Sequence, residues 1–91
     1  MIENGILHID EDFGSWKMQI NLNELIRATG EYMFYTDLIG KTTRQLMMKQ
    51  SEARKVLKFL MPYANANDIA WMDTEFEQNP VLAKIWRSLR K

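Results

Sequence analysis

Hydrophobic and polar residues alternate most clearly near the N-terminus. Every second residue of the segment 16–22 is apolar, and the three residues between them are polar. A repeat of two is typical of a half-buried β-strand. A short apolar run, residues 6–9, precedes this segment, and the acidic stretch 10–14, which ends in glycine, reads as a turn. The pattern therefore predicts an antiparallel β-hairpin.

A helical pattern follows in residues 42–63, the longest such run in the chain. Thr42 and Gln45 fit a capping box, and Pro62 ends the run because proline lacks a backbone N–H donor. Apolar residues recur at helical spacing along one stripe, Leu46, Ala53, Leu57 and Leu60, with Val56 and Met61 beside it. We therefore expect a central helix over residues 42–61.

Two segments have ambiguous patterns. Gln50 lies in the apolar stripe, so it either forms a hydrogen bond in the core or marks a break near Ser51 that divides the run into two shorter helices. Residues 31–36 are rich in aromatic side chains, which suits a third strand. Together with Leu38 and Ile39 they suit a continued helix equally well. We favour the helix because no turn signal bounds the segment.

Asparagine residues mark the starts of three further helices. Asn21 opens a second capping-box pattern, and Asn65 or Asn67 can begin the next helix. Asn79 before Pro80 combines a preferred N-cap residue with proline at the first helical position. Together with the hairpin, these signals predict one domain, residues 1–91, of the α+β class: an N-terminal β-hairpin followed by a small bundle of four to five helices, mostly helical.

The chain has more large apolar side chains than one small core needs. Its 91 residues include seven Met, three Trp, four Phe and three Tyr. Exposed methionine and aromatic clusters favour contacts between proteins. Eight residues are therefore candidate partner-binding positions, and each of them also suits a plain core role: Trp16, Tyr32, Phe34, Tyr35, Met47, Met48, Trp71 and Trp86.

Charge is distributed unevenly, although the formal net charge is zero. Residues 1–21 carry four acidic side chains and one basic, whereas residues 42–61 carry five basic and one acidic. The basic run indicates a solvated helix face, a face paired with the acidic hairpin within or between chains, or a nucleic-acid footprint. In the last case the helix start would enter a major groove. The candidate nucleic-acid contacts are Arg44, Gln45, Lys49, Arg54, Lys55 and Lys58.

No residue pattern points to catalysis or to a bound cofactor. The sequence has no cysteine, a single histidine (His8) and no glycine-rich phosphate loop. Asp10 and Asp12 do not complete a calcium loop, because Phe13 stands where a ligand is required. No apolar run approaches the roughly 20 residues of a membrane span, and no signal peptide opens the sequence. We therefore expect a cytoplasmic protein with no enzymatic activity, no membrane association, no metal and no cofactor.

These observations favour a small non-enzymatic protein that binds another protein and also itself. Inhibitors, adaptors and assembly factors have this character, and phages and mobile elements often encode such proteins. The alternative is a small DNA- or RNA-binding regulator that uses the basic face of the expected helix 42–61. A ligand pocket between copies, lined by Tyr32, Tyr35 and Arg44, is a third option.

Overall fold

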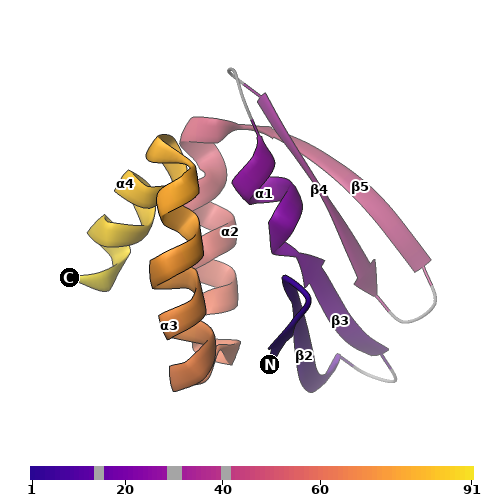
Figure 1. The fold of residues 1–91 in the computed structure, drawn as a ribbon. Helices are drawn as coiled ribbons and strands as arrows, with labels where there is room; N and C mark the ends of the chain where they lie inside the picture. The colour runs from indigo at the N-terminus through magenta and orange to yellow at the C-terminus, as the bar shows by residue number, and fades with distance from the viewer. Residues whose placement is uncertain (14–15, 29–31, 40–41) are drawn as a thin grey trace.

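A computed structural model describes the chain in four stretches, residues 1–13, 16–28, 32–39 and 42–91. Within them, five β-strands fill most of the first half, and three of the four α-helices follow in the second half (Figure 1). The predicted α+β class, with an N-terminal antiparallel hairpin and four helices, is confirmed. The sheet, however, contains more strands than the predicted hairpin alone.

The described strands form one antiparallel sheet in chain order, β1-β2-β3-β4-β5. Their bounds are β1 Ile2–Glu3, β2 Ile6–Phe13, β3 Trp16–Asn21, β4 Tyr32–Ile39 and β5 Thr42–Lys49. The β2–β3 register shifts between Ile9 and Phe13. By contrast, β4 and β5 pair without interruption from Tyr32 opposite Lys49 to Ile39 opposite Thr42. The sheet therefore ends at a short strand, β1, on one side and at a long regular strand, β5, on the other.

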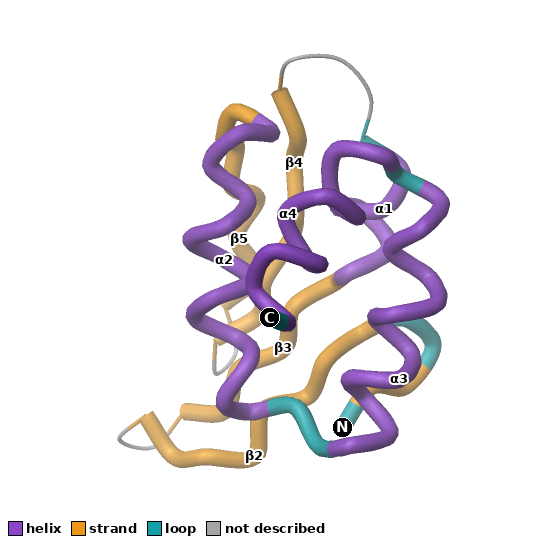
Figure 2. Tube along the Cα trace, turned by 90° about the vertical axis from the view of Figure 1, so that its left-hand side faces the viewer, coloured by secondary structure: helices purple, strands orange, loops and turns teal. Residues whose placement is uncertain are grey.

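The helices all cover the same face of the sheet. Their bounds are α1 Leu22–Arg27, α2 Ala53–Leu60, α3 Ala66–Glu75 and α4 Pro80–Arg90. They lie on the left of the sheet in Figure 1 and in front of it in Figure 2. In both views α2 and β5 lie on the same side of the molecule, which is the far side in Figure 1 and the left side in Figure 2. The opposite face of the sheet is covered by no described element.

Asparagine side chains begin three of the helices, as the sequence predicts. Asn21 Oδ1 accepts from the N–H of Asn23 at 3.1 Å at the start of α1. Asn65 and Asp68 form a full capping box at the start of α3. Asn79 Oδ1 accepts from two N–H groups in the first turn of α4, where Pro80 occupies the first helical position. Each cap satisfies N–H groups that have no partner within the helix.

The core lies between the sheet and the helical layer. The ring of Phe76 meets the indole of Trp86 edge to face, with centroids 5.3 Å apart. Burying a leucine or phenylalanine side chain of this kind contributes about 1.5–3 kcal/mol relative to leaving it in water. The largest buried apolar side chains come from both layers: Leu7, Ile9, Ile20, Leu22, Leu25, Leu57, Leu60, Met72, Phe76, Leu82 and Trp86.

The predicted central helix over residues 42–61 is wrong in its first half. Thr42–Lys49 is strand β5, Gln50–Glu52 is a short 3-10 turn, and the α-helix begins only at Ala53. The threonine pair at the start of this run favours a strand, and pairing with β4 along its whole length satisfies the backbone groups on one side of it. A break near Ser51 was one of the two alternatives for Gln50, and it is present, although a strand and not a helix precedes it. The apolar stripe holds for α2, whose Ala53, Val56, Leu57 and Leu60 are buried.

The preference for a helix over residues 31–36 is also wrong. Residues from Tyr32 onward form strand β4, and Glu31 lies outside the described residues. Aromatic side chains and a β-branched threonine fit a pleated surface better than a helix. The strand also needs β3 and β5 as neighbours, which no local pattern reveals.

Candidate functional site

Strand β5 forms an open edge of the sheet. It pairs with β4 on one side, and no described strand pairs with its other side. The strand has eight residues and contains neither glycine nor proline. A long, regular edge of this kind presents a row of backbone N–H and C=O groups that can pair with another strand. Natural sheets usually shorten, bulge or cover such edges, so an uncovered one is a candidate interaction site.

The two methionines of β5 have different surroundings. Met47 is 63% exposed, whereas Met48 is partly buried and packs against the core. Successive residues of a strand point to opposite faces of the sheet, which accounts for the difference. Met47 therefore presents a flexible, apolar side chain to solvent on the side of the sheet away from the helices. The register places the Phe34 position of β4 directly opposite Met47.

The helix α2 presents basic side chains to solvent beside this edge. Arg54, Lys55 and Lys58 are exposed, while the opposite face of the helix is buried. Arg54 Nη1 donates to Ser88 Oγ of α4 at 2.7 Å. Phe59 is 45% exposed, and its ring lies 5.8 Å from that of Tyr63. An apolar ring is thus left at the surface next to the three cations.

We define the β5–α2 surface as the outer edge of β5 together with six exposed side chains: Met47, Lys49, Arg54, Lys55, Lys58 and Phe59. This surface brings together one member of the predicted partner-binding set and four of the predicted nucleic-acid contacts. Arg44 and Gln45 belong to the same edge strand, but their side chains lie outside the described part of the structure. The sequence analysis assigned these residues to one helix, whereas they lie on strand β5 and helix α2.

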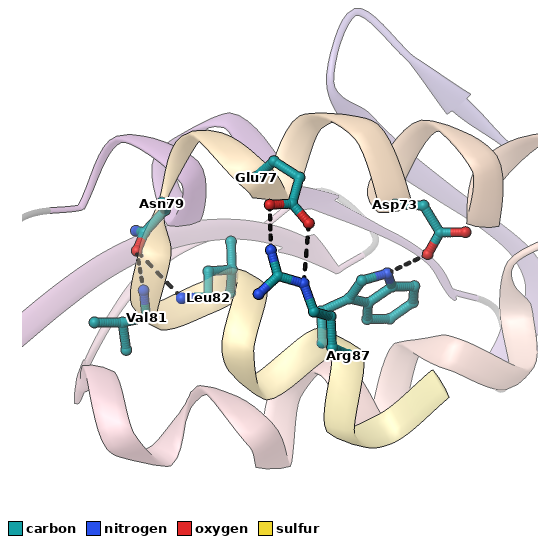
Figure 3. A network of polar contacts seen from close by, with 7 residues as sticks. Asp73, Glu77, Asn79, Val81, Leu82 and Arg87 are labelled. Carbon is teal, nitrogen blue, oxygen red and sulfur yellow. Dashed lines mark hydrogen bonds and ion pairs between the residues drawn. The ribbon is translucent and has the colours of Figure 1, made fainter. Parts of the chain in front are cut away.

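Arg87 and Arg90 of α4 are paired with carboxylates, and Figure 3 shows the pair of Arg87 with Glu77. Arg87 Nε donates to Glu77 Oε1 at 3.1 Å, and its Nη2 donates to the second oxygen. Arg90 donates to both oxygens of Asp73 at 3.0 and 3.2 Å. The hydrogen bond that Arg87 donates to Glu77 raises the pKa of Arg87, and the hydrogen bond from Arg90 lowers the pKa of Asp73. No such ion pair involves Arg54, Lys55 or Lys58 among the residues that the structure describes.

An open depression between α3 and α4 is a weaker candidate site. Its volume is about 340 Å³, and its lining comprises Asp73, Glu77, Trp86, Arg87, Arg90 and Lys91. Trp86 Nε1 donates to Asp73 Oδ1 at 2.6 Å. Arg87 and Arg90 donate to Glu77 and Asp73 in the same depression. These hydrogen bonds connect the two helices across the depression. Because the polar groups already bond to one another, few of them are left to hold a ligand.

The predicted partner-binding residues divide among three environments. Trp86 is 2% exposed and belongs to the core, so it offers no surface to a partner in this fold. Trp71 and Met48 pack partly buried against that core. Met47 is exposed. The four remaining residues lie on strands β3 and β4, and their side chains are outside the described part: Trp16, Tyr32, Phe34 and Tyr35.

The predicted mode of nucleic-acid recognition is wrong in one respect. Thr42–Lys49 is a strand, so Arg44 and Gln45 do not begin a recognition helix.

In the described residues, no group of three His, Asp or Glu side chains is arranged to hold a metal ion. The helices described here are also too short or too polar to cross a lipid bilayer.

Comparisons with protein-family models, with curated proteins and with solved structures each found no match to this chain. The function is therefore inferred from the residues and geometry of the chain itself.

Proposed function

We propose that this protein is a non-enzymatic protein-binding module whose partner docks on the β5–α2 surface. The observation that carries the proposal is the exposure of Met47, at 63%, on an edge strand whose outer side has no described neighbour. Apolar exposure and unsatisfied strand edges are both features that binding to a protein removes.

The edge and the exposed side chains contribute in different ways. A strand added to β5 would gain main-chain hydrogen bonds, which provide affinity with little sequence dependence. Met47 would provide an adaptable apolar contact, because its unbranched side chain fills irregular gaps. The α2 side chains would then select a partner by charge and by the exposed ring of Phe59. Inhibitors, adaptors and assembly factors all fit this arrangement.

Self-association is part of the same proposal. A second copy can offer its own β5 in the antiparallel direction, because one edge strand can pair with another of identical sequence. Such a dimer would extend the sheet through both copies. Concentration-dependent sedimentation detects it directly.

The test is affinity capture from a lysate of the source organism or its host, with the wild-type chain compared with Met47→Lys. We expect Met47→Lys to lose the captured protein, because a charge is then buried in the contact. Val81→Lys is the matched control, since Val81 is 44% exposed and belongs to α4, outside the residues that define the surface. Capture that is equally strong with all three chains would contradict the proposal.

A DNA- or RNA-binding regulator is the second candidate. It is favoured by Arg54, Lys55 and Lys58, which have no ion-pair partner among the described residues. Counterion release would make such binding steeply dependent on salt. Binding of a duplex or a single strand that falls sharply with salt, and that Lys58→Ala weakens, would support this candidate. Nuclease treatment that abolishes all capture would point the same way.

A further inference from the structure

We infer that the partner presents an extended, acidic segment of polypeptide to the β5–α2 surface. This inference rests on the proposed function and names the chemistry of the partner. The occupant is a strand that pairs with β5 and carries Asp or Glu side chains toward α2.

The charge of the surface carries the argument. Between α3 and α4, Glu77 and Asp73 neutralise Arg87 and Arg90. The exposed cations of α2, Arg54, Lys55 and Lys58, have no such carboxylate among the described residues. Only Glu52 is acidic in the run 42–61, whereas that run has five basic residues. Arg54, Lys55 and Lys58 thus place three exposed cations on one short helix, where an acidic partner would complement them.

The acidic residues at positions 10–12 of the same chain belong to β2, and β3 and β4 separate β2 from β5 in the sheet. The edge strand β5 therefore does not pair with the acidic strand of its own chain. We expect the complementary charge to come from another molecule.

Apolar side chains make a polypeptide a better occupant than a nucleic acid. Met47 places a thioether on the face of the sheet away from the helices, and Phe59 places an aromatic ring beside the cations of α2. Successive side chains of an extended peptide point to opposite sides, so its apolar side chains can face Met47 while its acidic side chains face α2. A nucleic acid would rely on phosphate contacts, and each contributes only about 0.9 to the slope of log affinity against log salt. Few cations on a chain of zero net charge provide few such contacts.

The test uses three probes with the full chain. They are a twelve-residue peptide that alternates Glu and Val, the same peptide with Gln in place of Glu, and a twelve-nucleotide oligothymidylate. We expect the Glu peptide to bind at low salt about tenfold or more tightly than the Gln peptide, because opposite charges attract strongly when screening is weak. Its amide N–H groups should perturb the β5 amide resonances in an NMR titration.

Charge reversal locates the site. Lys55→Glu with Lys58→Glu should weaken binding of the Glu peptide by about tenfold or more. Arg27→Glu with Lys84→Glu makes the same change in net charge at exposed positions of α1 and α4, and it should change binding by about twofold or less. Thermal unfolding of each variant verifies that it is folded.

Three results would overturn the inference: no binding of the Glu peptide, equal binding of the Glu and Gln peptides, or tighter binding of the oligothymidylate. If any of these occurs while Met47→Lys still abolishes capture of the partner, the acidic assignment fails and the proposed function stands. Unchanged capture with Met47→Lys overturns the proposed function and this inference with it.

Discussion

The backbone N–H of Ile2 donates to Oδ1 of Asp68 at 2.7 Å, across 66 residues of sequence. The other oxygen of the carboxylate accepts from the N–H of Asn65 at 3.0 Å and lies 3.3 Å from the α-ammonium of Met1. Burial raises the pKa of Asp68, but these donors outweigh burial and hold the pKa below its ordinary value of 3.8. The first strand is therefore fastened to the start of α3 by a charged group.

Asp68→Asn should destabilise the fold by about 1–3 kcal/mol at neutral pH. The amide nitrogen of asparagine cannot accept a hydrogen bond, so one of the partly buried N–H groups that now donate to the carboxylate would lose its acceptor. A lowered folded pKa stabilises the protein above the unfolded pKa, and that contribution is lost as the pH falls through the folded value. The gap between wild type and variant should therefore shrink below pH 3.8. Urea unfolding at several pH values measures it, with the exposed Glu52→Gln as control. A gap that stays constant down to strong acid would contradict this account.

Gly5→Ala should destabilise the turn between β1 and β2. Gly5 has φ +78° and follows Asn4 at φ 55°, and a Cβ at Gly5 would lie 2.1 Å from the side-chain nitrogen of Asn23. We expect a loss of about 1 kcal/mol or more in the free energy of unfolding. Adding Asn23→Ala removes the clash but keeps the left-handed backbone, so the double variant should recover part of the loss. Equal losses in both variants would mean that backbone conformation alone is responsible.

Asn79→Ala should destabilise the fold more than an ordinary N-cap change. Asn79 Oδ1 caps α4, and its Nδ2 donates to the carbonyl groups of Leu25 and Ala28 at 3.2 and 3.1 Å. Losing the cap costs about 0.5–2 kcal/mol, and the buried carbonyl of Leu25 loses a donor as well. Asn79→Asp keeps the cap but faces those carbonyl oxygens with a carboxylate, so it should not restore stability. Full stability in Asn79→Asp would show that the cap alone matters.

Arg90→Ala should raise the pKa of Asp73 toward its ordinary value. The hydrogen bond from Arg90 is the largest cause of the lowered pKa, burial opposes it, and the indole of Trp86 adds to it. An NMR titration of the side-chain carboxyl carbon measures the change. Arg87→Ala is the matched control, because Arg87 pairs with Glu77 and should leave the pKa of Asp73 unaltered. Equal shifts in both variants would refute the pairing of Arg90 with Asp73.

Local signals in the sequence predicted the features that depend on local contacts. The caps at Asn21, Asn65 and Asn79 and the first hairpin could be predicted because each needs only a few neighbouring residues. Asn4 and Gly5 also form a local hairpin-turn signal, and it could have revealed β1. The apolar residues around Met47 fit both a helical stripe and a strand, and only pairing with β4 decides between them.

Long-range features were beyond the sequence for the same reason. Nothing near Asp68 indicates that Ile2 lies beside it, and nothing near Arg87 or Arg90 selects Glu77 and Asp73 as their partners. These pairings decide which cations remain uncompensated. The basic run could therefore be recognised from the sequence, but its contrast with the paired Arg87 and Arg90 required the structure.

The most direct measurement is amide hydrogen exchange of the full chain, free and bound to the protein that it captures. If the partner docks on the β5–α2 surface, protection should increase at alternate N–H groups of Thr42–Lys49, the outer edge of β5, and the resonances of Lys55 and Phe59 should shift. The amide hydrogens of α3 and α4 should exchange at the same rates as in the free protein. Protection that appears at α3 and α4 and leaves β5 unchanged would contradict the proposed docking surface.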